Sequence, residues 1–512
     1  MFADFMAMLF CSVARRENRR IASYVTVFAT PLSDKRARQK AENVAARSIY
    51  ARLLPQWHLK RAFLVSCMLP WLTACMSAPK RDAESLAPDV PSSWSGSISV
   101  DGLPARWLDG FGDPVLSALV QEALNNNFDL KSASARVTAA AEQARIDGAG
   151  LWPQLSFAPG YERAQVRSAG FGNTEFGAFQ ALFDLNWELD VWGRIRAFRN
   201  AAVLEAEAAE ADLHAARLSL AARTAQSFFE LAEAKLQAEV AAQSIKDRKT
   251  LVDLVRGRFA RGLARGLDLR LALTDLANAE AQLARARDRL QSVTRRFEVL
   301  LGRYPSGREF ESARLPEPPA ALSAGLPSEL LARRPDLIAA FERLQAADAR
   351  LESANKALLP RIALTATGGT RSPALTELVD PRAVAWNAAI GLLQPLFTGG
   401  RLTGEIRRNE ALVDEALNDY KNTALEAFRE VEQALAAEEW LRQQETALRE
   451  AVEQTEASQS LAVYSYRHGF IEILTLLDSY RSTLNAQSAH LEVKRQLLGN
   501  RIALYLALGG SE

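Results

Sequence analysis

Residues 183–194 are FDLNWELDVWGR, and this stretch shows how the chain is built. Apolar and polar side chains alternate along it, with Phe183, Leu185, Trp187, Leu189 and Val191 interleaved with Asp184, Asn186, Glu188 and Asp190. Alternation with a period of two predicts a strand with one apolar and one polar face. After Gly193, the run from Arg194 to Arg256 contains neither Gly nor Pro and is rich in strong helix formers. We therefore expect a strand that leads into one long helix.

Three further segments, residues 154–161, 361–367 and 386–397, show a similar though less regular alternation. About nine to eleven residues suffice for a tilted strand to cross a bilayer. Trp152 and Trp192 lie at the ends of the first pair of strands, where aromatic residues favour the membrane interface. The alternative is an antiparallel sheet of a soluble domain, whose apolar face would be an aggregation hazard unless it were covered.

A second helix is expected after each long one. A break around Gly262 follows the first long run, and Gly469 follows the second, residues 405–468. Each long run would reach about 95 Å. After the first break, apolar residues recur in steps of three and four, at Leu269, Ala272, Leu276, Ala279, Leu283, Ala286, Leu290, Val293, Phe297 and Leu300. Such a seam predicts coiled-coil packing against neighbouring helices.

The whole pattern occurs twice, with an offset of 207 residues. Equivalent landmarks are Leu151-Trp152-Pro153 and Leu358-Leu359-Pro360, Gly193-Arg194 and Gly400-Arg401, Gly262 and Gly469, and Leu301-Gly302 and Leu508-Gly509. A fixed period indicates one structural unit used twice. We divide the chain into repeat one, residues 106–305, a linker, residues 306–324, and repeat two, residues 325–512.

Four strands cannot close a barrel, and a membrane tolerates no open sheet edge. Two chains would supply eight strands, too narrow for an open channel, whereas three would supply twelve. The predicted fold is mainly α with a membrane β-barrel: a duplicated unit forms a long coiled-coil α-helical barrel, continuous with a shared 12-stranded β-barrel in a trimer. Asp184, Asn186, Glu188 and Asp190 would then line the pore and give it a mild cation preference, or they are merely solvated.

The N-terminal part resembles a targeting segment. Lys60 and Arg61 precede an apolar run, residues 62–74, whose length fits a signal-peptide core rather than a spanning helix. It ends in LTAC at residues 72–75, which resembles a bacterial lipobox and predicts covalent lipid on Cys75. We expect a signal peptide over 58–74, a lipidated tether over 75–105, and a non-structural extension over 1–57.

Composition excludes several functions. The net charge is +1, and basic residues are interspersed with acidic ones, which indicates no nucleic-acid partner. The chain has three cysteines, Cys11, Cys67 and Cys75, so the repeats hold no disulfide and no Cys-based metal site. Phosphate loops, nucleophile elbows and clustered metal ligands are absent from the sequence. We expect no enzyme and no cofactor besides the lipid. A periplasmic adaptor would need neither four amphipathic strands nor a doubled helical unit.

Several motifs resemble the TolC-like outer-membrane efflux proteins, and within them the lipoprotein branch labelled NodT. They are Trp107 with Phe111-Gly112-Asp113-Pro114, residues 330–337 (LLARRPDL) and residues 395–401 (PLFTGGR). The resemblance covers about residues 75–510. It implies a lipid-anchored homotrimer in the bacterial outer membrane that extends into the periplasm. The trimer would export drugs or toxic compounds together with a periplasmic adaptor and an inner-membrane resistance-nodulation-division pump. The outlet of a type I protein secretion system shares this architecture and stays the alternative.

The resemblance also implies a periplasmic gate at the tip of the repeat-two helices. Leu474 would form an apolar ring and Asp478 an acidic ring, with Arg481 one turn further along. Apolar rings can dewet a constriction, and carboxylate rings select against anions. Repeat one has Leu267 and Leu271 at the equivalent positions, so the carboxylate belongs to repeat two alone. Alternatively, these are solvated charges on a helix surface.

Overall fold

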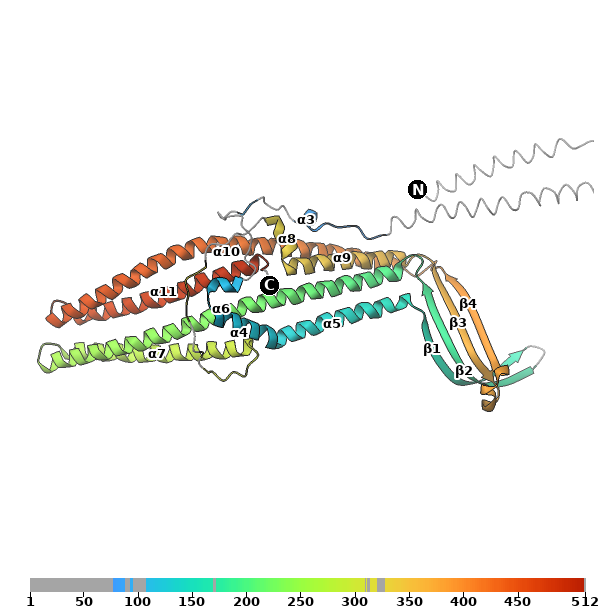
Figure 1. The fold of residues 1–512 in the computed structure, drawn as a ribbon, viewed down its shortest axis with the longest axis horizontal. Helices are drawn as coiled ribbons and strands as arrows, with labels where there is room; N and C mark the ends of the chain where they lie inside the picture. The colour runs from blue at the N-terminus through green and yellow to red at the C-terminus, as the bar shows by residue number, and fades with distance from the viewer. Residues whose placement is uncertain are drawn as a thin grey trace, which may run out of the picture. The chain divides into compact units, whose positions relative to one another are not determined.

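The computed structural model describes residues 77–87, 93–94, 107–168, 172–308, 310, 314–319 and 327–510. It groups Ala78–Glu512 as one compact unit, separate from Met1–Ser77. The predicted extension, the signal peptide and Cys75 therefore lie outside the described residues. Within Ala78–Glu512, long helices run beside one another and four strands form a single sheet (Figure 1).

Both repeats contain the same set of main elements, which confirms the duplication. In repeat one these are α5 (Phe128–Gly148), β1 (Gln154–Ser168), β2 (Gly172–Leu189), α6 (Arg194–Ala260) and α7 (Gly266–Leu300). In repeat two they are α9 (Pro335–Lys356), β3 (Arg361–Ser372), β4 (Val384–Leu393), α10 (Arg401–His468) and α11 (Ile473–Ala507). The shorter helices are α3 (Ala83–Leu86), α4 (Pro114–Asn126) and α8 (Leu330–Arg333), with 3-10 turns at Trp107–Phe111, Ala149–Leu151, Pro327–Glu329, Leu375–Val379 and Pro381–Ala383.

The helix α6 begins and α10 ends where the sequence predicts, but α6 continues four residues past Arg256 and α10 begins four residues before Glu405. The helix α6 has 67 residues and α10 has 68, so each extends about 100 Å. Gly193 precedes α6 with φ of +77°, and Gly469 ends α10 with φ of +78°, a left-handed conformation that glycine adopts without a Cβ clash. No helix in the described part of the chain is both long and apolar enough to cross a membrane.

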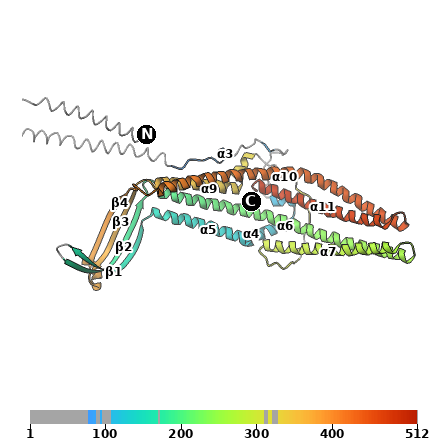
Figure 2. The ribbon, with the colours of Figure 1, turned by 180° about the vertical axis from the view of Figure 1, so that it is seen from behind.

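The predicted coiled-coil seam of α7 is confirmed. Ala272, Ala279, Val293 and Phe297 are buried, and the other members of the seam are half-buried. The helix α7 packs on α6, α11 packs on α10, and α6 also contacts α5, α9 and α11. Figure 2 shows the two hairpins, α6–α7 and α10–α11, from the opposite side. The main apolar core lies around Phe228, Phe229 and Phe297 and joins both repeats.

The LLARRPDL motif has a structural role. The Arg334 side chain is largely buried, and its guanidinium pairs with Asp336 and with Glu430 of α10, both at 2.7 Å. It also donates a hydrogen bond to the carbonyl of Ala507 at the end of α11. The motif therefore holds the start of α9 against both long helices of repeat two.

The turn after α7 depends on one buried carboxylate. Glu298 accepts hydrogen bonds from the Gly307 amide and the Ser306 hydroxyl, both at 2.7 Å, and from the Arg308 amide at 3.3 Å. Burial alone would raise the pKa of Glu298, but these bonds outweigh it, so the pKa lies below its usual range.

Replacing Glu298 with Gln is expected to destabilise the protein at neutral pH by about 1–3 kcal/mol, because an NH2 group that cannot accept replaces one of the two accepting carboxylate oxygens. A lowered carboxyl pKa contributes stability above the unfolded pKa, about 4.3, and this stability is lost as pH falls through the folded value. The difference in Tm between wild type and Glu298→Gln, followed by circular dichroism, should therefore shrink in acid. A difference that stays constant with pH would contradict this role.

The sheet is antiparallel, in the order β1-β2-β3-β4. The strands β1 and β2, with 15 and 18 residues, are longer than predicted. The predicted fourth strand, however, extended too far, since β4 ends at Leu393 rather than at residue 397. Pro395 has no amide hydrogen for the strand ladder, and the Gln394 side chain donates to the Leu358 carbonyl.

Candidate functional site: the sheet, its junction with the helices and the hairpin tips

One face of the sheet is predominantly apolar where all four strands pair. Cross-strand partners point to the same side of a sheet, and the register aligns Leu155 with Leu185, Leu185 with Ala366, and Ala366 with Ala388. Many of these side chains are uncovered, with Ile390 72% and Trp386 80% exposed. The face also includes Phe157, Tyr161, Phe183, Trp187, Ile362, Leu364 and Leu392.

The opposite face carries three of the four predicted pore residues. Asp184 lies between Ser156 and Thr367, and its carboxylate accepts a hydrogen bond from the Thr367 hydroxyl at 2.9 Å. Asn186 is exposed beside it, two residues along the strand. Glu188 is half-buried and pairs with Arg194 of α6 at 2.8 Å. The structure therefore places these three on one polar face.

Asp190 is placed differently from the prediction. The strand β2 ends at Leu189, and the Asp190 carboxylate accepts from the backbone amides of Ile195 and Arg196, at 3.0 and 2.9 Å. The first amides of a helix have no partner within it, and Gly193 has no side chain to satisfy them. Asp190 therefore caps α6, and its side chain is 8% exposed.

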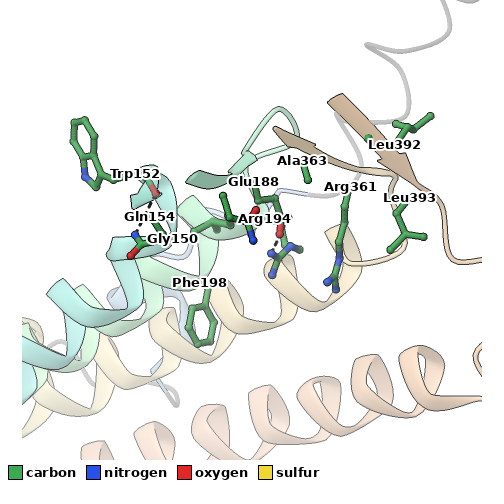
Figure 3. Close-up of a pocket in the computed structure, with 13 residues that line it drawn as sticks. Gly150, Trp152, Gln154, Glu188, Arg194, Phe198, Arg361, Ala363, Leu392 and Leu393 are labelled. Atoms are coloured by element: carbon green, nitrogen blue, oxygen red, sulfur yellow. Dashed lines mark hydrogen bonds and ion pairs between the residues drawn. The ribbon is translucent and has the colours of Figure 1, made fainter. Parts of the chain in front are cut away.

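A cavity of about 560 Å³ lies where the polar face meets α6 (Figure 3). Its polar lining includes Gln154, Asn186 and Arg361, and its apolar walls include Trp152 and Phe198. Sequence reasoning missed Arg361. The one available signal was its position as the first residue of a predicted strand. Its odd number places it on the same face of that strand as Thr365 and Thr367.

The predicted gate residues lie on the free face of α11. Leu474 is 56% exposed, and Arg481 pairs with Asp478 at 3.4 Å. Spacings of four and three place all three side chains on one side of the helix. The other side is buried against α6, through Ile473, Leu476, Leu477 and Tyr480 on Leu251, Val252 and Val255.

Two arginines that the sequence reasoning missed hold the hairpin tips. Near the end of α6, Arg258 donates to the carbonyls of Tyr466 and Arg467, both at 2.9 Å, and so joins the two hairpins. Arg248 is 3% exposed and pairs with Asp275 of α7 at 2.7 Å. Arg258 could have been found from the sequence, because basic side chains near a helix C-terminus often bond to free backbone carbonyls.

A sheet with one uncovered apolar face, continuing into two long helical hairpins, defines the class of this protein: a subunit of an outer-membrane channel of the TolC-like kind. The chain belongs to the outer membrane efflux protein family, whose model matches residues 119–303 and 326–510. The two matched segments begin and end 207 residues apart, which is the offset of the repeat.

Individual relatives agree with this membership. The chain is 32% identical to the pyoverdine export outer membrane protein OpmQ of Pseudomonas putida, over 87% of this chain and 97% of that protein. It is 33% identical to the outer membrane protein OprJ of Pseudomonas aeruginosa, over 88% of this chain and 96% of that protein. A crystal structure of a membrane protein from Pseudomonas aeruginosa aligns with a TM-score of 0.79 and 32% identity, covering 84% of this chain and 99% of that one. The Campylobacter jejuni CmeC outer membrane channel aligns with a TM-score of 0.78 and 25% identity, covering 85% of this chain and 94% of that one.

Proposed function

We propose that three copies of this chain form one channel through the outer membrane, which exports small molecules as the outlet of a tripartite efflux pump. The observation that carries the proposal is the open four-stranded sheet with an uncovered apolar face. Its outer strands, β1 and β4, each have one unpaired edge within the described chain. Backbone groups in lipid must be paired, so β4 of one copy pairs with β1 of the next, and twelve strands close the barrel.

The pore continues into the helical hairpins of the three copies, which extend into the periplasm. There a periplasmic adaptor and an inner-membrane resistance-nodulation-division pump complete the system and supply the energy. Relatives are named for pyoverdine export, toluene efflux and cation efflux. One channel architecture therefore serves chemically different cargo, which favours a pump that selects the cargo. These names favour an efflux outlet over the outlet of a type I secretion system.

The channel proposal is tested by extraction from outer membranes and reconstitution into planar bilayers. We expect a detergent-stable trimer that inserts and conducts, and we expect deletion of the gene to sensitise the bacterium to toxic compounds. A water-soluble single subunit that inserts no sheet into the bilayer would overturn the proposal.

We propose that Cys75 carries a lipid anchor and that the segment after it packs on the helices. The guanidinium of Arg81 pairs with the buried carboxylate of Asp348 of α9, and the Ala78 amide donates to Glu352 at 2.8 Å. The buried Tyr420 hydroxyl donates to the Ala83 carbonyl at 2.9 Å. This part of the expected tether is thus packed on α9 and α10, three residues after Cys75.

Replacing Cys75 with Ser is expected to abolish labelling of the protein by radioactive palmitate, because the thiol is the site where the lipid is first attached. Intact mass spectrometry of wild-type protein from membranes should show a chain that begins at the acylated Cys75, without residues 1–57 and the signal peptide 58–74. Cys67→Ser is the control and should label as wild type does. Equal labelling of Cys75→Ser, or residues 1–57 in the membrane-bound protein, would contradict the assignment.

A further inference from the structure

Arg361, on the polar face of the sheet, differs from Arg194 of α6 and from Arg371 of the same strand. It is half-buried at the start of β3, and it shares its face with Ala363 and Thr365. Arg194 is paired with Glu188 and Arg371 with Glu162, at 2.8 and 2.9 Å. Among the residues that the structure describes, none forms a hydrogen bond or ion pair with the Arg361 side chain, which points toward the cavity in Figure 3.

The acidic groups nearest to Arg361 are already engaged. The Glu188 charge is balanced by Arg194, and the Asp190 carboxylate is held by the first turn of α6. Asp184 lies level with Thr367, six residues along the strand from Arg361, which is about 20 Å. The junction cavity therefore contains one uncompensated positive charge. A partly desolvated guanidinium without an anion is unfavourable, and a planar anionic group can satisfy it with two parallel bonds.

The rest of the cavity suits an aromatic body. Its volume of about 560 Å³ lies in the range of small-molecule sites. Trp152, Phe198 and Leu393 provide apolar walls, and the side chains of Gln154 and Asn186 add hydrogen-bonding groups. Amphipathic anions combine such a body with a charged group that Arg361 can bind.

We infer that Arg361 and this cavity form a binding subsite for the carboxylate or sulfonate group of aromatic anions, at the junction of the barrel and the helices. The inference rests on the proposed channel, because the polar face then lines the lumen and three copies of Arg361 form a ring. The Arg361 ring attracts anions at the helical end of the barrel. Three copies of Asp184 form a separate acidic ring further along the strands.

The test measures block of single channels in planar bilayers at neutral pH by naphthalene-2-sulfonate, added on the barrel side. Neutral 2-naphthol, with the same ring system, is the control ligand. We expect dose-dependent block by the sulfonate and little by the naphthol. Arg361→Gln should raise the half-blocking concentration about tenfold or more, since a charged hydrogen-bond partner is lost. Arg361→Lys keeps the charge but lacks the planar guanidinium, so its half-blocking concentration should lie between those of wild type and Arg361→Gln.

Arg371→Gln is the matched control variant, because it makes the same substitution on the same face of the same strand, ten residues away, and should keep wild-type block. Equal block of Arg361→Gln and wild type, or a conducting wild type that the sulfonate does not block, would overturn the subsite and leave the channel proposal standing. A wild type that does not conduct at all would overturn the channel itself. If Arg361→Gln does not form trimers, Phe198→Ala serves instead, because it removes one apolar wall of the cavity. We expect Phe198→Ala to weaken the block by the sulfonate. Unchanged block of Phe198→Ala would also overturn the subsite.

Discussion

Channels in which Asp478 and Arg481 are both replaced by Ala are expected to conduct roughly severalfold more current than wild type, because a charged constriction at the hairpin tips limits the pore. We propose that Asp478 and Arg481, together with Leu474, form this periplasmic gate. The two charged side chains lie on the free face of α11, while Leu476, Leu477 and Tyr480 pack on the other side. The substitutions therefore alter the constriction without removing the packing that holds the tip.

Single-channel recording in planar bilayers measures the effect. The matched control is Asp253→Ala with Arg256→Ala, which removes a similar ion pair, three residues apart and exposed, from α6 of the repeat-one hairpin. The control should conduct as wild type does, and both variants should form trimers. An unchanged conductance of the Asp478 and Arg481 variant, or an equal rise in the control, would show that these residues are solvated surface charges.

Replacing Ala388 with Lys is expected to prevent insertion into the outer membrane. Ala388 lies on the exposed apolar face of β4, in register with Ala366. A lysine facing lipid near the bilayer midplane costs about 2–4 kcal/mol, and a trimer contains three copies, so the expected cost is about 6–12 kcal/mol for each channel. Membrane fractionation and heat-resistant trimers on denaturing gels are the measurements.

Ala389→Lys provides the control. Ala389 is exposed like its neighbour Ala388, but it lies on the polar face of the sheet, in register with Thr365. The two variants make the same chemical change on adjacent residues. Ala389→Lys should insert normally, because its charge enters the water-filled lumen. If both variants insert equally well, the apolar face does not meet lipid and the shared barrel is wrong.

The sequence predicted most of the secondary structure, since that follows from local patterns. Alternation along residues 183–189 indicated β2, the lack of Gly and Pro after Gly193 indicated α6, and the offset of 207 residues indicated two equivalent halves. These signals follow from the side-chain geometry of strands and helices and from backbone propensities, which act between residues close in sequence. Strand ends were predicted less accurately. Residues 394–397 were wrongly included in the fourth strand, although Gln394 and Pro395 interrupt its alternation and β4 ends at Leu393.

Only the tertiary structure decided how individual charged groups are used. Asp190 continues the alternation of β2, yet it caps α6, because the chain turns at Gly193 and brings the free amides of the helix to its carboxylate. Arg258 joins the hairpins through carbonyls more than 200 residues away. Arg361 has no ion-pair partner among the described residues, because the nearby carboxylates of Glu188 and Asp190 are held by Arg194 and by the first turn of α6. Pattern along the chain determines which face of an element is apolar, whereas the partner of a charged side chain depends on which distant segments packing brings within a few ångströms.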